Sequence, residues 1–455
     1  MQRVAKARKL WSCLLGCEKK SEAGTLVNGK VVKVASLSRS KAIHTLATQS
    51  TSHDLHAFVA NCLVHAYAQC GSMEDASRVF SAIHHKDQLS WSEMILGYAE
   101  TGEGKLALDL YTRMKEEGCP VNHVTILAAL KACVSLAEGD ENNRAQCLEK
   151  GRGIHFDAAT TRNEQQIFVA SALVDMYARC GRLAEARGVF EKMEQRNTVS
   201  WNSLILGTTE SGQADAALEL YSRMKREGFT PDAITYVAVL KACGSLGALE
   251  AGRKVEAEIS SAGIREKDTM VCNSLVDFYG KCGSMADARR VFEWIGGNRR
   301  DIVSWNELID GYTRQGDSKQ AFEAFERLCS GETPIRPNGV TFLVMLMLCS
   351  HASLLDRAKD YFQAMVLEHG VALDVKHFTC LVDLLGRADR LDEAVAMAKS
   401  IPCEASDLLW TSVLSSSWKW KNALTGTIAF QAMKNVETSS SAFMLISDIY
   451  KEQKR

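Results

Sequence analysis

The sequence predicts an all-α protein, a right-handed α-solenoid (superhelix) built from helix–turn–helix repeats of about 35 residues. Two observations lead to this prediction. Three families of segments recur along the chain with the same apolar pattern, and Gly and Pro separate apolar runs of helical periodicity. Because only 5 of the 455 residues are Pro, long uninterrupted helices are permitted.

Similar segments recur at intervals of about 105 residues. One trio reads LSWSEMILGYAETG, VSWNSLILGTTESG and VSWNELIDGYTRQG, at 89–102, 199–212 and 303–316. A second trio lies at 59–80, 169–190 and 271–292, and a third at 124–136, 234–246 and 340–352. The interval therefore divides into three units of about 35 residues.

Each unit is predicted to contain two helices. In 198–232, apolar residues at helical spacing lie on both sides of Gly212, which suits a helix C-cap with positive φ. Gly228 closes the second helix, and Pro231 prevents its continuation. Because both helices have an apolar face, each hairpin must pack against its neighbours. Leu204, in the first helix, is expected in that core.

Charge and cysteine usage exclude several classes of protein. The 54 basic and 55 acidic side chains give a net charge of -1, so any basic surface has to be local. Fifteen Cys occur without a C-x-x-C motif, and five of them stand at repeated positions, three in AQCG, ARCG and GKCG and two in KAC. These Cys are expected as small core residues in a reducing compartment, with no disulfide framework and no zinc site. No apolar run is long enough for a membrane span, so no membrane partner is expected.

The first 17 residues contain four basic side chains and no acidic one. This composition is compatible with an organelle transit peptide. Residues 11–17 also fit the first helix of a degenerate repeat, so both interpretations stay open.

The residues within the repeats resemble the pentatricopeptide repeat (PPR) family. A period near 34 also fits tetratricopeptide arrays, but the V-[ST]-W-N opening, the A-L-x-L-Y-x-x-M-K-x-x-G second helix and the P-D or P-N ending are similar to PPR motifs. The three alternating lengths resemble the plant-type PLS subclass of ordinary, long and short motifs. The predicted motifs are long 7–56, short 57–87, ordinary 88–122, long 123–166, short 167–197, ordinary 198–232, long 233–268, short 269–301, ordinary 302–338, long 339–374 and short 375–406.

This resemblance implies three regions. An N-terminal segment with a degenerate long repeat covers 1–56, the array covers 57–406, and 407–455 resembles the E-type extension of the subclass. A polar insertion at 139–149 falls between the helices of a long motif, where a surface loop is expected.

No catalytic constellation is found, and the chain is not expected to be an enzyme or to need a cofactor. Arrays with an E-type extension often continue into a deaminase (DYW) domain, whose zinc chemistry needs H-x-E and C-x-x-C. Neither motif occurs. The chain stops inside what resembles the second half of the extension, so a fragment and a protein that recruits a deaminase in trans remain alternatives.

The resemblance implies that each repeat reads one base of single-stranded RNA through its fifth and last residues. Small amide, hydroxyl or carboxylate side chains there can pair with a base edge, although Asn near a helix start also fits a capping role. The expected readout pairs of the ordinary and short motifs are Asn61 with Asp87, Ser92 with Asn122, Ser171 with Asn197, Asn202 with Asp232, Asn273 with Asp301, and Asn306 with Asn338.

Residues in the second place of each motif are expected to stack on the bases, with core packing as the alternative. They are Leu89, Val199 and Val303 in the ordinary motifs, and Phe58, Phe168 and Met270 in the short ones. The long motifs carry aliphatics in the fifth place and are expected to be silent. The last short motif, with Thr379 and Ser406, departs from the pattern. The family's pairing preferences imply the hypothetical target 5′-U-A-x-A-U-x-U-Y-x-x-3′.

These features predict a sequence-specific binder of an organellar transcript, in a mitochondrion or chloroplast. The expected role is to mark a site for C-to-U RNA editing, with the deaminase or another editing factor bound in trans through the C-terminal extension. RNA stabilisation or processing without editing, and a helical-repeat scaffold for proteins, remain the alternatives.

Overall fold

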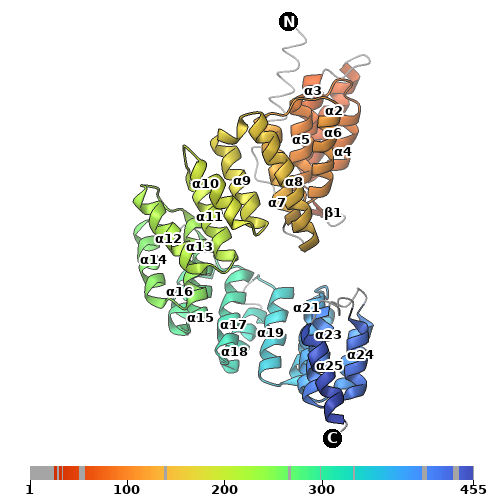
Figure 1. Cartoon of the computed structure of the whole chain (residues 1–455), viewed down its shortest axis with the longest axis vertical. Helices are drawn as coiled ribbons and strands as arrows, with labels where there is room; N and C mark the ends of the chain where they lie inside the picture. The colour runs from red at the N-terminus through yellow and green to blue at the C-terminus, as the bar shows by residue number, and fades with distance from the viewer. Residues whose placement is uncertain are drawn as a thin grey trace. The chain divides into compact units, whose positions relative to one another are not determined.

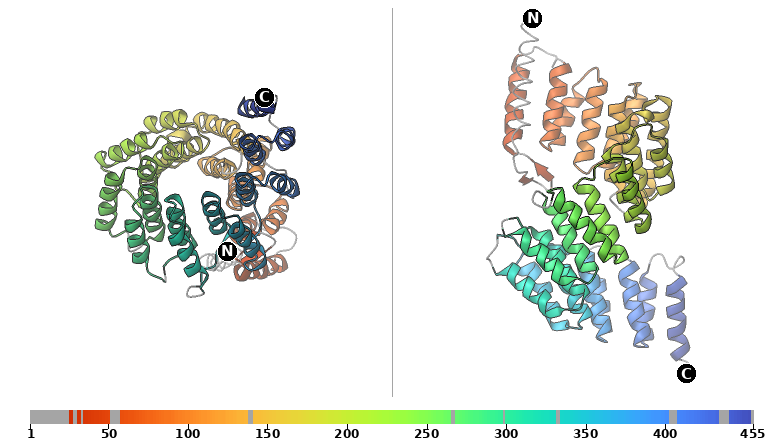
Figure 2. Two further views of the ribbon diagram at one scale, coloured as in Figure 1. Left: turned by 90° about the horizontal axis from the view of Figure 1, so that it is seen from below. Right: turned by 90° about the vertical axis from the view of Figure 1, so that its left-hand side faces the viewer.

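A computed structural model describes residues 25–27, 30–32, 34–50, 57–137, 141–264, 268–297, 299–330, 334–401, 407–433 and 440–453. The chain divides into two compact units, residues 1–238 and 239–455. In each unit, helical hairpins stack side by side, which confirms the predicted all-α solenoid of helix–turn–helix repeats (Figures 1 and 2).

The first unit contains a strand pair followed by helical hairpins. Its elements are β1 (Thr25–Val27), β2 (Lys30–Val32), α2 (Val34–Ser50), α3 (Ala57–Gln69), α4 (Met73–Ser81), α5 (Gln88–Glu100), α6 (Gly104–Glu116), α7 (His123–Ala137), α8 (Glu141–Thr160), η1 (Asn163–Gln165), α9 (Ile167–Arg179), α10 (Leu183–Lys192), α11 (Thr198–Glu210) and α12 (Ala214–Arg226).

Helix α13 (Ala233–Leu246) crosses the boundary between the units. The second unit continues with α14 (Leu249–Ser261), α15 (Thr269–Lys281), α16 (Met285–Ile295), α17 (Ile302–Arg314), α18 (Ser318–Cys329), α19 (Gly339–His351), α20 (Leu355–Leu367), α21 (Val375–Arg387), α22 (Leu391–Ser400), α23 (Asp407–Lys419), α24 (Ala423–Ala432) and α25 (Ser440–Gln453).

The first helix of each hairpin begins on the first residue of a predicted motif, from Ala57 in α3 to Asp407 in α23. These first helices pack against one another within each unit, as α3, α5, α7, α9 and α11 do in the first and α15, α17, α19, α21 and α23 do in the second. The second helix of a hairpin packs against its own first helix, as α6 does on α5 and α18 does on α17. The first helices therefore form one layer of each unit.

The recurring Trp residues join neighbouring repeats. Trp201 of α11 is fully buried, and its ring meets that of Phe190 in the preceding repeat edge-on, with centroids 4.6 Å apart. The guanidinium of Arg223, in the second helix of the same repeat, lies 5.5 Å from the Trp201 ring. Trp91 and Trp305 have the same arrangement of a Phe edge and an Arg. The aromatic contact explains why Trp recurs in every third repeat.

Two turn predictions are confirmed. Gly212 has φ of 76° and Gly228 has φ of 84°, the left-handed conformation that ends a helix. The amide N–H groups of Gly212 and Gln213 donate to the carbonyls of Thr209 and Thr208, which satisfies the end of α11.

The polar insertion at 139–149 does not form the expected surface loop. Residues 141–149 are the first turns of α8, which extends to 20 residues. The insertion contains Glu, Ala, Gln and Leu, which favour helix, and no Pro. Cys147 within it is buried, so part of the inserted helix packs into the core.

The described part of the N-terminal segment differs from an ordinary repeat. Strands β1 and β2 pair antiparallel, with Thr25 opposite Val32 and Val27 opposite Lys30, and one helix, α2, follows. Residues 1–24 and the gaps after them lie outside the described residues. The transit peptide and the helix at 11–17 therefore stay predictions.

The C-terminal extension continues the helical stack. Side chains of α21 to α25 share one hydrophobic core, which includes Val382, Leu409, Val413 and Ile446. Within the described residues, no helix has the length and hydropathy to cross a bilayer. The same residues contain no cluster of His, Cys, Asp or Glu suited to a metal ion.

We predict that Leu204→Ala lowers the free energy of unfolding by about 2–5 kcal/mol, because Leu204 is fully buried in α11 and its truncation leaves a cavity. Urea unfolding followed by circular dichroism measures the change. Val199→Ala, on the exposed side of the same helix, is the control and should change stability by no more than about 0.5 kcal/mol. Equal effects of the two variants would contradict the assignment of the core face.

Candidate nucleic-acid interface

The predicted pair Asn202 and Asp232 meets between two neighbouring repeats. Asn202 lies in α11, and its amide Nδ2 donates to Asp232 Oδ1 at 2.9 Å and Oδ2 at 3.1 Å. Asp232 precedes α13 and accepts the backbone N–H of Thr235 at 2.9 Å. The hydroxyl of Thr235 donates to Asn202 Oδ1 at 2.6 Å. The amide is therefore held at both ends.

The other three Asn-type pairs repeat this contact. In each, Nδ2 of the fifth residue donates to a carboxylate or amide oxygen of the last residue, across 26 to 32 positions of sequence. The distances to Oδ1 are 3.0 Å for Asn61 and Asp87, 3.1 Å for Asn273 and Asp301, and 3.3 Å for Asn306 and Asn338.

The two Ser-type pairs behave differently. Ser171 Oγ lies 3.2 Å from Asn197 Oδ1 but also donates to the carbonyl of Ile167 at 2.6 Å. Ser92 and Asn122 have no hydrogen bond to each other among the described contacts. Each instead bonds Gln88, Ser92 at its backbone carbonyl and Asn122 at Oε1. The shorter Ser side chain reaches its own helix backbone more readily than the neighbouring repeat.

The capping alternative holds for the last residue of each pair. Asp87, Asn197, Asp301 and Asn338 are N-caps with capping boxes on α5, α11, α17 and α19. The fifth residues are not caps, because they lie inside the helix, and all of them except Ser92 contact the cap residue of the next helix. In these five pairs the last residue begins one helix and contacts the fifth residue of another.

Hydrogen bonding keeps the cap carboxylate of the first pair ionised. Burial alone would raise the pKa of Asp87, but hydrogen bonds from the Ser90 amide and hydroxyl, from Asn61 and from Leu89 outweigh it and hold the pKa below the usual 3.8. An ionised carboxylate only accepts hydrogen bonds, so Asn61 must turn its NH₂ group toward Asp87.

The second-place residues are exposed, which argues against core packing. Leu89, Val199 and Val303 are 49%, 58% and 44% exposed. The second-place Phe168 and Met270 of the short motifs are also exposed, whereas the side chain of Phe58 lies outside the described residues. Exposed apolar side chains at a regular spacing offer flat contacts for planar rings.

Long motifs show the expected aliphatic fifth residues and one unexpected feature. Leu127, Val237 and Leu343 are half-buried and offer no polar group to a base. Their second-place residues, however, are as exposed as those of the other motifs; they are Val124, Ile234 and Val340. In the last short motif, Thr379 donates to the carbonyl of Val375 and Ser406 lies outside the described residues.

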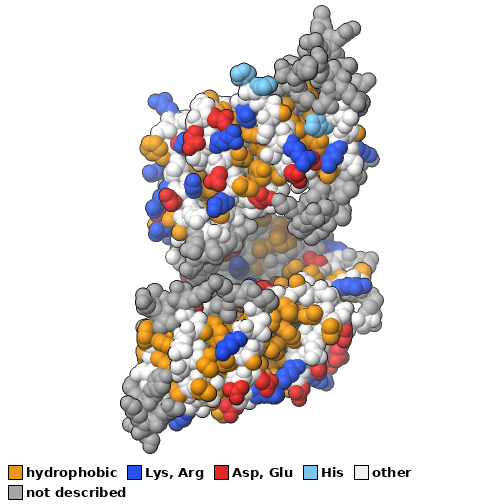
Figure 3. Space-filling view, turned by 90° about the vertical axis from the view of Figure 1, so that its right-hand side faces the viewer, with side chains coloured by type: hydrophobic (Ala, Val, Ile, Leu, Met, Phe, Trp, Pro, Cys, Tyr) orange, Lys and Arg blue, Asp and Glu red, His pale blue; other side chains and the backbone are white. Residues whose placement is uncertain are grey.

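Basic side chains of the first helices are paired with acidic ones. Lys281 Nζ lies 2.6 Å from Asp277 and Arg314 Nε 2.6 Å from Asp310, each four residues apart in one helix. Arg179 and Arg387 have the same arrangement with Asp175 and Asp383. On the face shown in Figure 3, acidic and basic side chains are interspersed. These pairs offset part of the positive charge of the first helices.

One carboxylate in this layer is perturbed. Burial, together with the neighbouring carboxylates of Asp277 and Asp310, raises the pKa of Glu307 to about 7, against the lowering effect of Lys281 and Arg314. Glu307 follows the readout residue Asn306 in α17.

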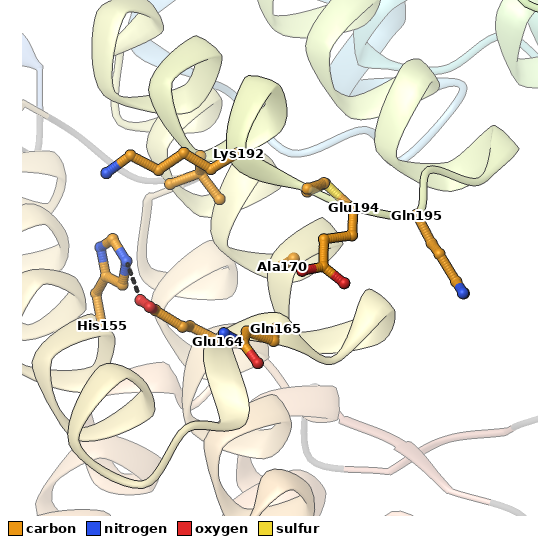
Figure 4. Close-up of a pocket in the computed structure, with 9 residues that line it drawn as sticks. His155, Glu164, Gln165, Ala170, Lys192, Glu194 and Gln195 are labelled. Atoms are coloured by element: carbon orange, nitrogen blue, oxygen red, sulfur yellow. Dashed lines mark ion pairs between the residues drawn. The ribbon is translucent and has the colours of Figure 1, made fainter.

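A cavity of about 250 Å³ lies apart from the pairs, between α8, η1, α9 and the end of α10 (Figure 4). His155 and Glu164 form an ion pair across 3.7 Å at one side of it, with Lys192 nearby. Burial lowers the pKa of His155, and Glu164 partly offsets this. No lining residue belongs to a readout pair.

Family profiles match most of the array. A profile described as PPR repeat matches 58–87, 89–119, 168–198, 270–293 and 340–369. The PPR repeat family profile matches 196–245, and the pentatricopeptide repeat domain profile matches 294–352. The chain belongs to the pentatricopeptide repeat family.

Relatives in this family come from Arabidopsis thaliana. The pentatricopeptide repeat-containing protein CRR2, chloroplastic, is 34% identical over 421 residues, which cover 92% of this chain and 62% of CRR2. The mitochondrial protein At2g03880 is 32% identical over 394 residues, 86% of this chain and 60% of the relative. The chloroplastic protein At1g11290 is 31% identical over 91% of this chain and 50% of its own length. The chain thus spans about half to three fifths of these relatives.

Solved PPR structures share the fold. The crystal structure of maize PPR10 superposes with a TM-score of 0.57 at 15% identity, covering 92% of this chain and 65% of PPR10. PPR10 in complex with an 18-nt psaJ RNA element gives a TM-score of 0.59 at 16% identity, covering 93% of this chain and 62% of that one.

The PPR geometry includes polar residues that the sequence reasoning missed. Gln88 bridges one Ser-type pair, and the hydroxyl of Thr235 holds one Asn-type pair. The signal for Thr235 was the recurrence of Ser or Thr in the third place after each of the six motifs that supply a readout pair. Nothing in the sequence pattern indicated Gln88, because the first place of the motifs varies.

We predict that Glu307→Gln changes how stability depends on pH. Because the folded pKa of Glu307, about 7, exceeds the usual 4.5, the folded chain binds this proton more tightly than the unfolded chain does. The contribution of Glu307 to the free energy of unfolding of the wild type therefore falls as pH rises from about 4.5 to 7. The amide variant has no titrating group at this position and lacks this decrease. Thermal unfolding at pH 5.5 and pH 8 measures the melting temperature of both proteins. The difference in Tm between the variant and the wild type should shift in favour of the variant at pH 8. Parallel profiles would contradict the assignment.

Proposed function

We propose that this chain binds single-stranded RNA in a sequence-specific manner, with one base read by each ordinary or short repeat. The observation that supports this most directly is the recurrence of one polar pair between neighbouring first helices, next to exposed apolar second-place residues. A base stacked on the apolar residue would present its hydrogen-bonding edge to the pair. All twelve readout residues named from the sequence belong to this proposal, with Leu89, Val199 and Val303 as stacking residues.

The Asn amide has the hydrogen-bonding capacity that such a role needs. Asn202 uses one N–H on Asp232 and one lone pair on Thr235, so one N–H and one lone pair remain. Uracil offers a ring N–H beside carbonyl oxygens, which complements this donor and acceptor. Long motifs, with aliphatic fifth residues, would act as spacers.

The cellular role follows from relatives and is part of the same proposal. Relatives carry chloroplastic or mitochondrial names, and PPR10 was solved with an RNA element. We place this chain in a mitochondrion or chloroplast, as the recognition factor for a C-to-U editing site. The helices at 407–455 would bind the deaminase or another editing factor, and the chain itself would not be an enzyme.

Crosslinking in the organelle tests this role. The bound transcript should contain the predicted bases near a cytidine that loses conversion when the gene is disrupted. Stabilisation or processing without editing predicts instead a change in transcript abundance or ends, with conversion intact.

A scaffold that binds proteins is a second candidate function, because the basic side chains of the first helices are paired with acidic ones and are less available to RNA phosphates. Scaffolding predicts no RNA affinity, whereas RNA binding weakens as salt rises.

We predict that exchanging the cap residue exchanges base preference. Asp232→Asn should relax the preference for U to either pyrimidine at the fifth base of the target, because the ionised acceptor is lost while Asn still caps α13. The reciprocal Asn338→Asp should narrow the base preference at the eighth position of the target from either pyrimidine to U. Binding of short RNAs that vary only at these bases, followed by fluorescence anisotropy, measures both changes.

The second base of the target, assigned to Ser92 and Asn122, is the internal control in both variants. Its preference should stay unchanged. Unchanged preferences at the fifth and eighth bases, with wild-type affinity, would overturn the assignment of the pairs.

A further inference from the structure

The third residue of a repeat is a buried hydroxyl after each of the six ordinary and short motifs that supply a readout pair, whereas Leu409 follows the last short motif, 375–406. The six hydroxyl residues are fully buried; they are Ser90, Thr125, Ser200, Thr235, Ser304 and Thr341. After the long motifs the same place holds Val59, Val169, Val271 and His377 instead. The hydroxyl thus occurs together with an Asn or a Ser in the fifth place of the repeat before it.

The hydroxyl takes one of two orientations, according to the fifth residue it faces. Where the fifth residue of the preceding repeat is Asn, the hydroxyl donates to its amide oxygen, at 2.6 Å from Thr235 to Asn202 and 2.7 Å from Ser304 to Asn273. Ser90 and Thr341 also lie 2.7 Å from the amide oxygens of Asn61 and Asn306. The cap residue offers a second acceptor, at 2.7 Å from Ser90 and 3.0 Å from Thr341. Where the fifth residue is Ser, the hydroxyl donates to the backbone carbonyl of the residue that caps its own helix, at 2.9 Å for both Thr125 and Ser200.

The hydroxyl holds the side-chain amide of Asn202 in one of its two flip orientations. The backbone N–H of Asp232 donates to Thr235 Oγ1 at 3.0 Å. The hydroxyl proton then has two acceptors in reach, and Asn202 Oδ1 at 2.6 Å is nearer than Asp232 Oδ1 at 3.0 Å. Asp232 takes the NH₂ end of the same amide. A flipped amide would lose both bonds and place its oxygen against the Asp232 side chain.

The orientation of the amide decides between uracil and cytosine. Uracil has a donor at ring N3, whereas cytosine has an acceptor there. At one fixed position of the base, an amide oxygen facing N3 matches uracil, and an amide NH₂ facing N3 matches cytosine. An amide free to flip would accept both pyrimidines, and an amide held in place would accept one.

We infer that Ser90, Thr235, Ser304 and Thr341 are positioning residues for base readout, which hold the Asn of the preceding repeat in the orientation that selects uracil over cytosine. They act through Asn61, Asn202, Asn273 and Asn306 rather than by touching the base. The inference rests on the proposed function and adds a third residue to each Asn-type pair. The weaker hold on Asn306, whose partner Asn338 lies at 3.3 Å, is consistent with a looser choice at that repeat.

The test compares Thr235→Val with Thr125→Val in the full chain. Both variants remove a fully buried hydroxyl that receives the backbone N–H of the cap residue, at 3.0 Å in each case. Of the two hydroxyls, only that of Thr235 donates to the fifth residue of the preceding repeat. The structure accommodates Val in this place, because Val169 and Val271 occupy it fully buried. The probes are short RNAs of the proposed target with U or C at the fifth base, measured by fluorescence anisotropy.

The ratio of affinities for U over C at the fifth base should fall by about fivefold or more in Thr235→Val. The ratio should stay at the wild-type value in Thr125→Val and in Thr235→Ser, which restores the hydroxyl. The two Val variants should lower Tm by similar amounts, and both should keep the preference for A at the second base.

An unchanged U-over-C ratio in Thr235→Val, on a chain whose wild type discriminates, would overturn the inference and leave the proposed function standing. An equal fall in Thr125→Val would overturn it as well, because loss of the cap alone would then explain the effect. A wild-type chain without any base preference at this position would overturn the proposed function itself, and the inference with it.

Discussion

The structure depends on one recurring interaction, in which the last residue of a repeat caps the first helix of the next repeat. Asp232 shows it most fully: one carboxylate accepts the backbone N–H of Thr235 and the side-chain amide of Asn202. The cap sets where α13 begins, and the bond to Asn202 ties that point to the preceding first helix. In the Asn-type pairs, stability and the placement of polar groups therefore depend on the same few atoms.

This double role explains why a near-neutral chain can present an ordered row of polar groups. The fifth residues are buried at 3% to 7% exposure, yet their partners satisfy most of their hydrogen bonds. Beside them, exposed second-place residues such as Val199 remain in contact with solvent. Four cations of the first helices are paired within their own helix, so phosphate binding there would compete with pairs such as Lys281 with Asp277.

Much of the fold follows from local sequence, because helix ends and helix periodicity are local properties. Gly212 and the starts of α11 and α13 follow from turn residues and apolar spacing alone. The insertion at 139–149 was predicted wrongly, because its charges suggested a loop while its helix-forming residues extend α8.

The candidate site was predictable by position but not by contact. The resemblance to PPR motifs named Asn202 and Asp232, and these side chains do meet. Spacing could not show that Gln88 lies between Ser92 and Asn122. Nor could it show which way the Thr235 hydroxyl turns. Both depend on side-chain reach between helices about 30 residues apart in sequence.

The central claim is that each polar pair reads one base in chain order. Selection of RNAs from a randomised pool by the purified chain, followed by sequencing, tests it most directly. The account predicts an enriched element with U at the first, fifth and seventh bases, A at the second and fourth, a pyrimidine at the eighth, and no preference at the bases opposite long motifs. An enriched element with its strongest preferences opposite the long motifs, or no enrichment at all, would contradict it.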